Sequence, residues 1–259
     1  MELDYNTFKG EFKEESCIKT HEFTKRETKI RFGTWRGRDV VLKYCYKELE
    51  ALLHSKLPPH PNIVEFIAIV RRPGNVHATN KHKRNTRTYV LMEEGSVDLM
   101  TMCYGFDLQE SLSTMIDIVK GLQHLHACGI VHHDMKMGNV LLTPSGYKIC
   151  DLGASEFTNV HGHGSNDHRR RITGTRTYLA PEQAGDSLVP ITNKIDIYAV
   201  GIVGRKLLSE DEPTTTNIES YLHIMTCCYS IDPGDRCTAD ELLKQLVVLQ
   251  EKLEPLETL

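Results

Sequence analysis

Three side chains of different chemistry lie close together near the middle of the chain. Asp134 supplies a carboxylate, Lys136 an ammonium group and Asn139 an amide, and apolar segments at 129–131 and 140–142 flank the loop that carries them. Transfer of a phosphoryl group needs these functions together, because the attacking hydroxyl must be oriented and the negative charge of the transition state must be offset. The residue types and their spacing therefore indicate a catalytic loop for phosphoryl transfer.

Two further motifs follow this loop along the chain. Residues 132–139 have the pattern H-x-D-x-K-x-x-N, Asp151 begins the turn Asp-Leu-Gly, and residues 180–182 are Ala-Pro-Glu. In this order the motifs resemble the catalytic loop, the metal-binding turn and the end of the activation segment of a eukaryotic-type serine/threonine protein kinase. The resemblance covers residues 16–250, and the compact chain is similar to kinases encoded by large DNA viruses.

The resemblance implies a role for each polar residue of the site. Asp134 would orient the substrate hydroxyl, and Lys136 would neutralise charge on the phosphoryl group. Asn139 and Asp151 would each hold one Mg2+ beside the phosphates of ATP. Thr175, in the segment that would hold a peptide, is the expected hydroxyl partner of Asp134 and Lys136. Lys136 and Thr175 are typical of the serine/threonine class, so the implied reaction is ATP-dependent phosphorylation of serine or threonine in proteins.

The same resemblance implies an α+β, two-lobed fold within a single protein kinase domain, residues 1–259. The expected parts are a small β-rich N-lobe, residues 1–93, and a mainly helical C-lobe, residues 94–259. Runs of β-branched and aromatic residues predict strands, at 16–23, 29–35, 40–45, 63–70 and 88–92. Helical spacing of apolar residues and the family pattern predict helices, from Glu48 to before Pro58, at 107–126, from about Asp196, and ending near Leu253.

The composition is that of an ordinary globular protein. The chain has 259 residues, of which 40% are hydrophobic and 25% charged, enough for a sizeable core. Its net charge of −4 gives no reason to expect attraction to nucleic acid or to a membrane. The eight cysteines form no C-x-x-C pair, and no apolar run approaches the roughly 18 residues of a membrane span. We therefore expect a soluble, intracellular protein, cytoplasmic or nuclear, with no membrane or specific nucleic-acid partner.

Lys43 ends an apolar strand, where an ammonium group is costly unless it meets an anion. In the resemblance its partners are the α- and β-phosphates of ATP and a glutamate of the next helix. The family register selects Glu50 as that glutamate, with Glu48 as the alternative. A lysine that simply extends to solvent is the other explanation.

The segment after the last predicted strand of the small lobe resembles the hinge that binds adenine through backbone hydrogen bonds. Met92 is the expected gatekeeper, and Glu93 and Gly95 belong to the hinge. Asp98 lies where a ribose hydroxyl would be met. The resemblance thus implies a nucleotide site that uses these four residues.

Two segments of the small lobe depart from an ordinary pattern. The usual G-x-G-x-x-G loop is absent, and Lys25, Arg26 and Lys29 are expected to reach phosphate in place of backbone amides. The connection 71–87 carries six Lys or Arg residues and no acid. It is either a solvated hairpin or a site for an acidic protein, RNA or a phosphorylated partner.

Three residues of the large lobe are expected to have structural roles. In the resemblance Arg236 forms a buried ion pair with Glu182, and Asp196 begins the central helix. Removal of either partner of a buried ion pair destabilises a protein strongly.

His133 stands directly before Asp134, where many regulated kinases have arginine. Because neutral histidine cannot form the bidentate clamp of arginine, phosphorylation of the candidate acceptors Ser155, Ser165 and Thr173 is not expected to be the main switch.

Two other functions are compatible with parts of the sequence. The missing glycine loop favours a catalytically inactive pseudokinase scaffold that binds protein partners, whereas the intact Lys43, Asp134 and Asp151 favour an enzyme. A small-molecule kinase would share the catalytic aspartates but would not be expected to keep residues 180–182 together with Thr175. Metal-dependent transfer from ATP distinguishes the enzyme from the scaffold.

Overall fold

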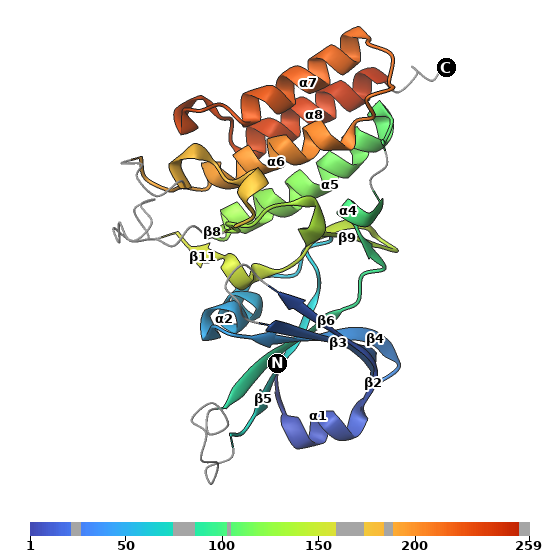
Figure 1. Cartoon of the computed structure of the whole chain (residues 1–259), viewed down its shortest axis with the longest axis vertical. Helices are drawn as coiled ribbons and strands as arrows, with labels where there is room; N and C mark the ends of the chain where they lie inside the picture. Colours follow the sequence, from blue (N-terminus) through green and yellow to red (C-terminus); the bar gives the residue numbers. More distant parts are fainter. Residues whose placement is uncertain (22–26, 75–85, 103–104, 159–173, 184–188, 254–259) are drawn as a thin grey trace. The chain divides into compact units, whose positions relative to one another are not determined.

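The structure, a computed structural model, divides into two units, each described by itself. The first holds Met1–His60 and Val64–Gly95, and the second holds Pro61–Ile63 and Ser96–Leu259. A sheet dominates the first and helices the second (Figure 1), which confirms the predicted α+β fold. The division follows Gly95, slightly beyond the expected Glu93. The described residues are 1–21, 27–74, 86–102, 105–158, 174–183 and 189–253, with backbone alone at 17–21 and 27–29.

The first unit contains a six-stranded sheet in the order β1-β5-β6-β4-β3-β2. Neighbouring strands are antiparallel, except that β1 and β5 are parallel. Arg36 and Gly37 have φ values of 52° and 76°, which a two-residue hairpin between β3 and β4 requires. The bounds are β1 Glu2–Asp4, α1 Tyr5–Glu11, β2 Phe12–His21, β3 Glu27–Trp35, β4 Arg38–Cys45, α2 Glu48–Lys56, β5 Phe66–Arg72 and β6 Arg87–Glu93.

The first two elements, β1 and α1, have no counterpart in the sequence-based prediction. Asp4 caps α1, because its carboxylate accepts hydrogen bonds from the amides of Asn6 (2.9 Å) and Thr7 (3.0 Å). Phe8 is 2% exposed and joins the apolar core on one face of the sheet. A helix this short shows no clear periodicity, so its burial depends on the sheet it covers. The core residues are Phe8, Trp35, Val40, Leu42, Ala68, Val70, Tyr89 and Leu91.

The second unit is mainly helical. In Figure 1 the long helices α5, α6, α7 and α8 lie side by side. Most of the short strands and 3-10 turns of this unit lie between α5 and α6 along the chain. The helices are α4 Leu99–Met102, α5 Leu108–Ala127, α6 Lys194–Leu207, α7 Thr216–Cys228 and α8 Ala239–Leu253. The strands are β7 Val97–Asp98, β8 Ile130–Val131, β9 Val140–Thr143, β10 Gly146–Ile149 and β11 Glu156–Phe157. The 3-10 turns are η1 Met137–Asn139, η2 Leu152–Ala154, η3 Arg176–Tyr178, η4 Pro181–Gln183 and η5 Pro233–Asp235.

Helix α5 confirms the periodicity seen in the sequence. Asp107 and Glu110 form a reciprocal capping box at its start, and its apolar positions are buried. The helix passes so close to the second unit's segment 61–63 that only glycine fits at Gly121, where a Cβ would lie 2.5 Å from the carbonyl oxygen of Asn62. That carbonyl accepts a hydrogen bond from Ile149 N (2.9 Å), so it is held in place.

One predicted strand is corrected at its start. Residues 63–70 were expected to be extended, but β5 begins at Phe66, and Ile63 forms an isolated parallel bridge with Ile149 of the second unit. The apolar run thus serves two different units, which a pattern along the chain does not reveal.

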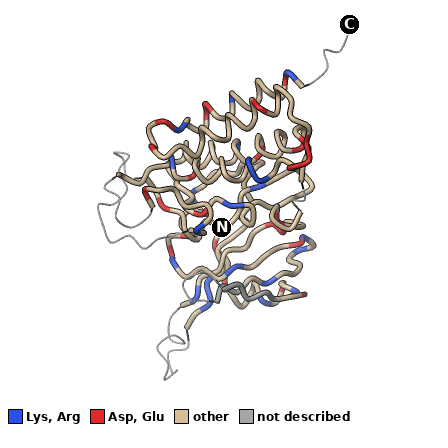
Figure 2. The backbone as a smooth tube through the Cα atoms, turned by 45° about the horizontal axis from the view of Figure 1, so that its top comes forward, with Lys and Arg blue, Asp and Glu red and all other residues tan. Residues whose placement is uncertain are grey.

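Charges of both signs are interspersed along each unit in Figure 2, in line with the net charge of −4. Within the described ranges, no helix combines the length and the apolar character that crossing a membrane would require.

The helical glycines Gly10 and Gly121 should respond oppositely to alanine. A Cβ at Gly10 meets no atom within 4 Å, so Gly10→Ala should stabilise the protein by about 0.5–1 kcal/mol through helix propensity. Gly121→Ala should instead destabilise it by about 1–3 kcal/mol, because the new methyl group meets a fixed carbonyl. Urea unfolding of both variants and of the unaltered chain measures the difference. An unchanged stability for Gly121→Ala would contradict the close approach.

Candidate functional site

The second unit positions the expected catalytic loop between β8 and β9. Strands β9 and β10 form an antiparallel hairpin in which Val140 pairs with Ile149. Asn139 directly precedes this hairpin and Cys150 directly follows it, and Cys150 N donates a hydrogen bond to the Asn139 carbonyl oxygen (3.0 Å). The hairpin therefore brings Asn139 and Asp151, twelve positions apart in the sequence, to the same end of a small sheet.

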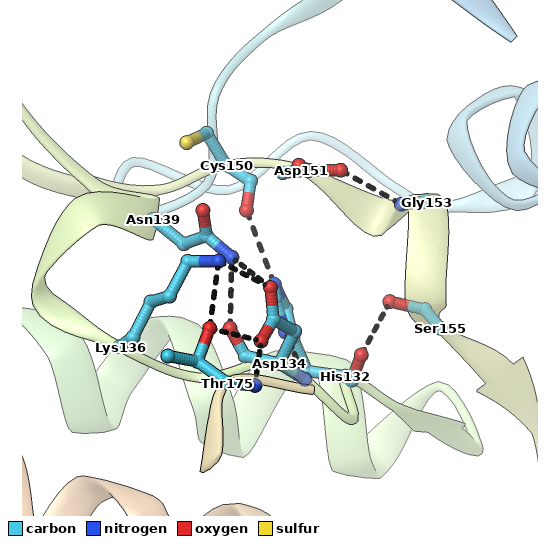
Figure 3. Close-up of polar contacts among 9 residues, drawn as sticks. All are labelled: His132, Asp134, Lys136, Asn139, Cys150, Asp151, Gly153, Ser155 and Thr175. Carbon is cyan, nitrogen blue, oxygen red and sulfur yellow. Dashed lines mark hydrogen bonds and ion pairs between the residues drawn. The ribbon is translucent and has the colours of Figure 1, made fainter. Parts of the chain in front are cut away.

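Asp134 lies at the centre of the polar contacts (Figure 3). Its Oδ2 accepts a hydrogen bond from Lys136 Nζ at 2.6 Å. Its Oδ1 accepts from the amide of Thr175 at 2.9 Å and from the Thr175 hydroxyl at 3.1 Å. The same hydroxyl accepts from Lys136 Nζ at 3.1 Å. The contacts that the sequence analysis expected for Thr175 are thus present, and an alcohol group lies directly beside the carboxylate.

Gly174 permits this close approach of the Thr175 segment to Asp134. Its φ is 112°, and a Cβ there would lie 2.9 Å from the carbonyl oxygen of His133. A side chain at this position would therefore be strained and would push Thr175 away from Asp134.

The amide of Asn139 is oriented by Asp134. Its Nδ2 donates to the main-chain oxygen of Asp134 at 2.8 Å and to its Oδ2 at 3.2 Å. Because both amide hydrogens are used, the side-chain oxygen of Asn139 faces away from Asp134, as Figure 3 shows. The Asp151 backbone is left-handed (φ 65°), and its Oδ1 accepts from Gly153 N at 2.9 Å.

These two side chains suit Mg2+, which prefers oxygen ligands and commonly takes only one or two protein carboxylates together with phosphate and water. Asn139 offers an amide oxygen and Asp151 a carboxylate. Among the residues that the structure describes, there is no group of three or more His, Cys, Asp or Glu side chains that could form an all-protein metal site. The amide oxygen of Asn139 and the carboxylate of Asp151 are two hard oxygen donors, which fits a metal that completes its coordination with phosphate and water.

A buried carboxylate holds the backbone of the loop. Asp196, at the start of α6, is 0% exposed. Its Oδ2 accepts from His132 N (2.8 Å), its Oδ1 accepts from His133 N (2.9 Å), and His126 Nε2 lies 3.0 Å from Oδ2. Burial alone would raise the pKa of Asp196, but the His126 hydrogen bond and the nearby histidines outweigh it and hold this pKa below its usual range. Asp196 thereby fixes the turn at His133, whose φ is 69°.

The ring of His132 joins the loop to the residue before Asp151. Its Nδ1 accepts from Asp134 N (3.2 Å), so Nε2 carries the proton and donates to the Cys150 carbonyl (3.1 Å). The ring is fully buried. The roles of His132 and His126 were not predicted from the sequence. The H-x-D pattern was the only signal for the first, and no local signal identifies the second.

A second buried group holds the end of the segment 174–183. Arg236 Nη1 and Nη2 donate to the two oxygens of Glu182 at 2.6 and 2.9 Å, and the side chains are 0% and 2% exposed. The remaining guanidinium hydrogens go to main-chain oxygens of Ser230 (2.8 Å), Ile231 (3.2 Å) and Lys194 (3.1 Å). The expected ion pair is present, and all five arginine donors are used.

In the first unit, Lys43 pairs with the helix glutamate that the register selected. Lys43 Nζ lies 2.8 Å from Glu50 Oε1, and the side chains are 6% and 5% exposed. Glu48, the alternative, accepts instead from the Thr88 hydroxyl (2.6 Å) and from Arg71 (2.9 Å). The buried pair excludes the explanation of a lysine that extends to solvent.

The hinge residues have local structural contacts. Met92 is buried in β6, and Gly95 ends the first unit. Glu93 Oε1 accepts from Glu65 N at 2.7 Å. Asp98 caps α4 by accepting from the Thr101 amide (2.9 Å) and hydroxyl (3.0 Å). Their contacts with a nucleotide stay predictions.

The structure corrects two expected residues, and other expected residues lie outside the side chains that it describes. Ser155 is wrong as a phosphate acceptor, because it is 2% exposed and its hydroxyl donates to the His132 carbonyl at 3.1 Å. Arg71 is not available to a partner as assumed for segment 71–87, because it pairs with Glu2 and Glu48, both at 2.9 Å. Arg72 lies over the ring of Tyr5. Outside the described side chains lie Lys25, Arg26, Lys29, Ser165, Thr173 and segment 75–85.

Comparison with known proteins agrees with this geometry. The model of the protein kinase domain matches residues 16–221, and the chain belongs to this family. It is 28% identical over 195 residues to a probable serine/threonine-protein kinase of Arabidopsis thaliana, SIS8, covering 70% of this chain and 18% of that protein. It is 26% identical over 251 residues to a probable serine/threonine-protein kinase of Dictyostelium discoideum, drkC, covering 83% and 32%. The chain thus spans a third or less of the length of these relatives.

Loss of the buried Glu182–Arg236 pair should lower the free energy of unfolding more than loss of an exposed pair of the same type. Arg236→Ala and Glu182→Ala should each cost about 3–5 kcal/mol of unfolding free energy, because each leaves a buried group unpaired. Arg38→Ala is the control, since Arg38 and Glu65 form an Arg–Glu pair at 2.9 Å with side chains 51% and 45% exposed, and should cost under about 1 kcal/mol. Equal losses in urea unfolding would contradict the assigned burial.

Asp196 should contribute to acid sensitivity. Because its pKa is lower in the folded chain, its stabilisation is complete above the unfolded pKa of about 3.9 and is lost as pH falls through the lower folded value. Asp196→Asn should therefore reduce stability at pH 7, and the difference from the unaltered chain should shrink towards pH 3. Urea unfolding at several pH values measures this difference. A difference that does not vary with pH would show that the carboxylate charge is not the cause.

Proposed function

We propose that this protein transfers the γ-phosphoryl group of ATP to serine or threonine hydroxyls of proteins, with Mg2+. The observation that carries the proposal is the arrangement of Asp134, whose carboxylate accepts from an alcohol at 3.1 Å while Lys136 contacts both groups. The Thr175 amide also binds Asp134, so the segment proposed to hold the substrate lies against the carboxylate. The Thr175 contact supports the proposal that an alcohol side chain of a substrate would meet the same carboxylate.

Each residue then has one task. Asp134 orients the acceptor hydroxyl and accepts its proton. Lys136, which is held by Asp134 and Thr175, places positive charge beside the transferring group. The side-chain oxygen of Asn139 and the carboxylate of Asp151 would hold Mg2+, which when bound offsets the charge of the phosphate oxygens. These tasks need rigid placement, which the buried contacts of His132 and Asp196 supply.

In the first unit, Lys43 would bind the α- and β-phosphates of ATP. Its ion pair with Glu50 supports this role, because the pair fixes the direction of a long side chain that would otherwise lose entropy on binding. Met92, Glu93 and Gly95 would line the adenine site, and Asp98 would meet the ribose. We further propose that residues 1–259 act as one kinase domain, and that the protein works inside the cell, where ATP is abundant.

One observation favours a second candidate function. Residues 24–29 contain no glycine, and glycine is the residue that most readily lets backbone amides approach phosphate closely. A pseudokinase scaffold would need no such contacts. It would bind an acidic or phosphorylated protein through the basic connection 71–87, of which Arg71 is already paired within the first unit.

Two isosteric substitutions distinguish the enzyme from the scaffold. Asp134→Asn removes the proposed base, and Asp151→Asn removes the negative charge of a proposed Mg2+ ligand. Each substitution should lower the rate of phosphoryl transfer by at least about a thousandfold, while the free energy of unfolding changes little. Asp211→Asn, on an exposed turn after α6, is the matched control and should retain full activity. The measurement is transfer from labelled ATP to a mixed serine and threonine peptide library, with and without Mg2+.

Equal activity of both variants and the unaltered chain would disprove the enzymatic role. Absence of transfer by the folded, unaltered chain would favour the scaffold.

A further inference from the structure

Two cysteines outside the candidate site lie in contact. Cys228 is the last residue of α7 and is fully buried, while Cys237 is partly exposed. Their Sγ atoms are 3.9 Å apart, and both thiols are free. A disulfide has an S–S distance of about 2.05 Å, so the two sulfur atoms are in contact without being bonded, and a disulfide requires that they move closer together.

The two sulfur atoms differ in their helix environments. Cys228 lies at the C-terminal end of α7, where the helix dipole disfavours a thiolate. Cys237 directly precedes Thr238, whose hydroxyl accepts from Glu241 N (3.2 Å) and whose amide donates to Glu241 Oε2 (2.7 Å) at the start of α8. The N-terminal end of a helix favours a negative charge. Position alone thus makes Cys237 the better thiolate.

Hydrogen bonding acts in the same direction. The hydrogen bond from the Cys228 thiol lowers the pKa of Cys237, burial opposes this, and the Lys194 ammonium adds to the lowering, while Glu241 acts against it. The same contact with Cys237, together with burial, raises the pKa of Cys228. The pair therefore consists of one thiolate-forming cysteine and one cysteine that stays protonated beside it.

We propose that Cys237 and Cys228 are a peroxide-oxidised thiol pair, in which Cys237 attacks the oxidant and Cys228 resolves the product. The Cys237 thiolate displaces hydroxide from hydrogen peroxide and becomes a sulfenic acid. Formation of the sulfenic acid removes the Cys237 thiolate whose contact keeps the Cys228 thiol protonated. Cys228 then gives its proton to the departing sulfenic hydroxyl, its sulfur attacks the Cys237 sulfur as a thiolate, water leaves, and a disulfide forms. One peroxide is reduced to two waters, counting the protonated hydroxide, and two thiols are oxidised.

The location connects this site to the substrate segment. Cys237 directly follows Arg236, and the chain between the two cysteines supplies the Ser230 and Ile231 oxygens that bind the same guanidinium. A disulfide between Cys228 and Cys237 would covalently link the two ends of the segment 228–237, which contains Arg236, the partner of Glu182. The proposal concerns thiol chemistry and does not depend on kinase activity.

Cys227 serves as an internal control, because it can be oxidised in competition with Cys237. It is exposed and adjacent to Cys228, so a mechanism governed by exposure alone would oxidise Cys227 first. Trypsin cleaves after Arg236 and therefore separates Cys237 from the peptide that carries Cys227 and Cys228. The linked peptides identify the proposed disulfide, and Cys227→Ser removes the ambiguity between the neighbouring cysteines.

The experiment treats the reduced, folded full chain with one equivalent of hydrogen peroxide, alkylates free thiols and analyses tryptic peptides by mass spectrometry. We expect a link between Cys228 and Cys237 that persists in Cys227→Ser and is absent in Cys237→Ser. In Cys228→Ser, dimedone should trap a sulfenic acid at Cys237. Loss of the free Cys237 thiol should be at least about tenfold faster than loss of the Cys227 thiol, and urea should abolish this preference.

The rate comparison uses the unaltered chain, so it holds even where a variant fails to fold. Faster oxidation of Cys227, a link made by Cys227, or no link between Cys228 and Cys237 would each overturn the proposal.

Discussion

The carboxylate of Asp196 is the constraint on which the candidate site depends. It is fully buried, yet it accepts hydrogen bonds from two consecutive main-chain amides and contacts His126. A buried charge is tolerated only when its acceptor capacity is used, so the loop must present both amides inward. That requirement produces the left-handed backbone at His133 and sets the direction in which Asp134 leaves the turn.

Hydrogen bonds within the second unit connect the fixed turn to the other polar residues of the candidate site. His132 links the amide of Asp134 to the carbonyl of Cys150, immediately before Asp151. Asn139 is oriented by Asp134 on the other side. Phosphoryl transfer relies on positioning and electrostatics more than on covalent chemistry by the protein. A rigid network that sets three polar side chains is therefore what such a reaction requires.

Buried and exposed ion pairs have different importance in this molecule. Glu182 and Arg236 are shielded from water, and every arginine donor has an acceptor, so the pair is sensitive to loss of either partner. Lys43 and Glu50 are similarly buried in the first unit. Pairs such as Arg36 with Glu11 and Arg38 with Glu65 lie at the surface, where solvent screening leaves them little effect on stability. The buried pairs thus mark the positions at which the sequence tolerates little change.

The sequence by itself determined the types and order of the candidate catalytic groups and the periodicity of α5, because these depend on local spacing, and its resemblance to the family selected Glu50 for Lys43. Only the tertiary structure decided that Ser155 is buried, that His126 meets Asp196 seventy residues away, and that β1 and α1 complete the sheet. Such features arise from contacts between distant segments, and their burial and partners do not appear in any local pattern. The physical reason is that packing, unlike periodicity, is a property of the folded chain.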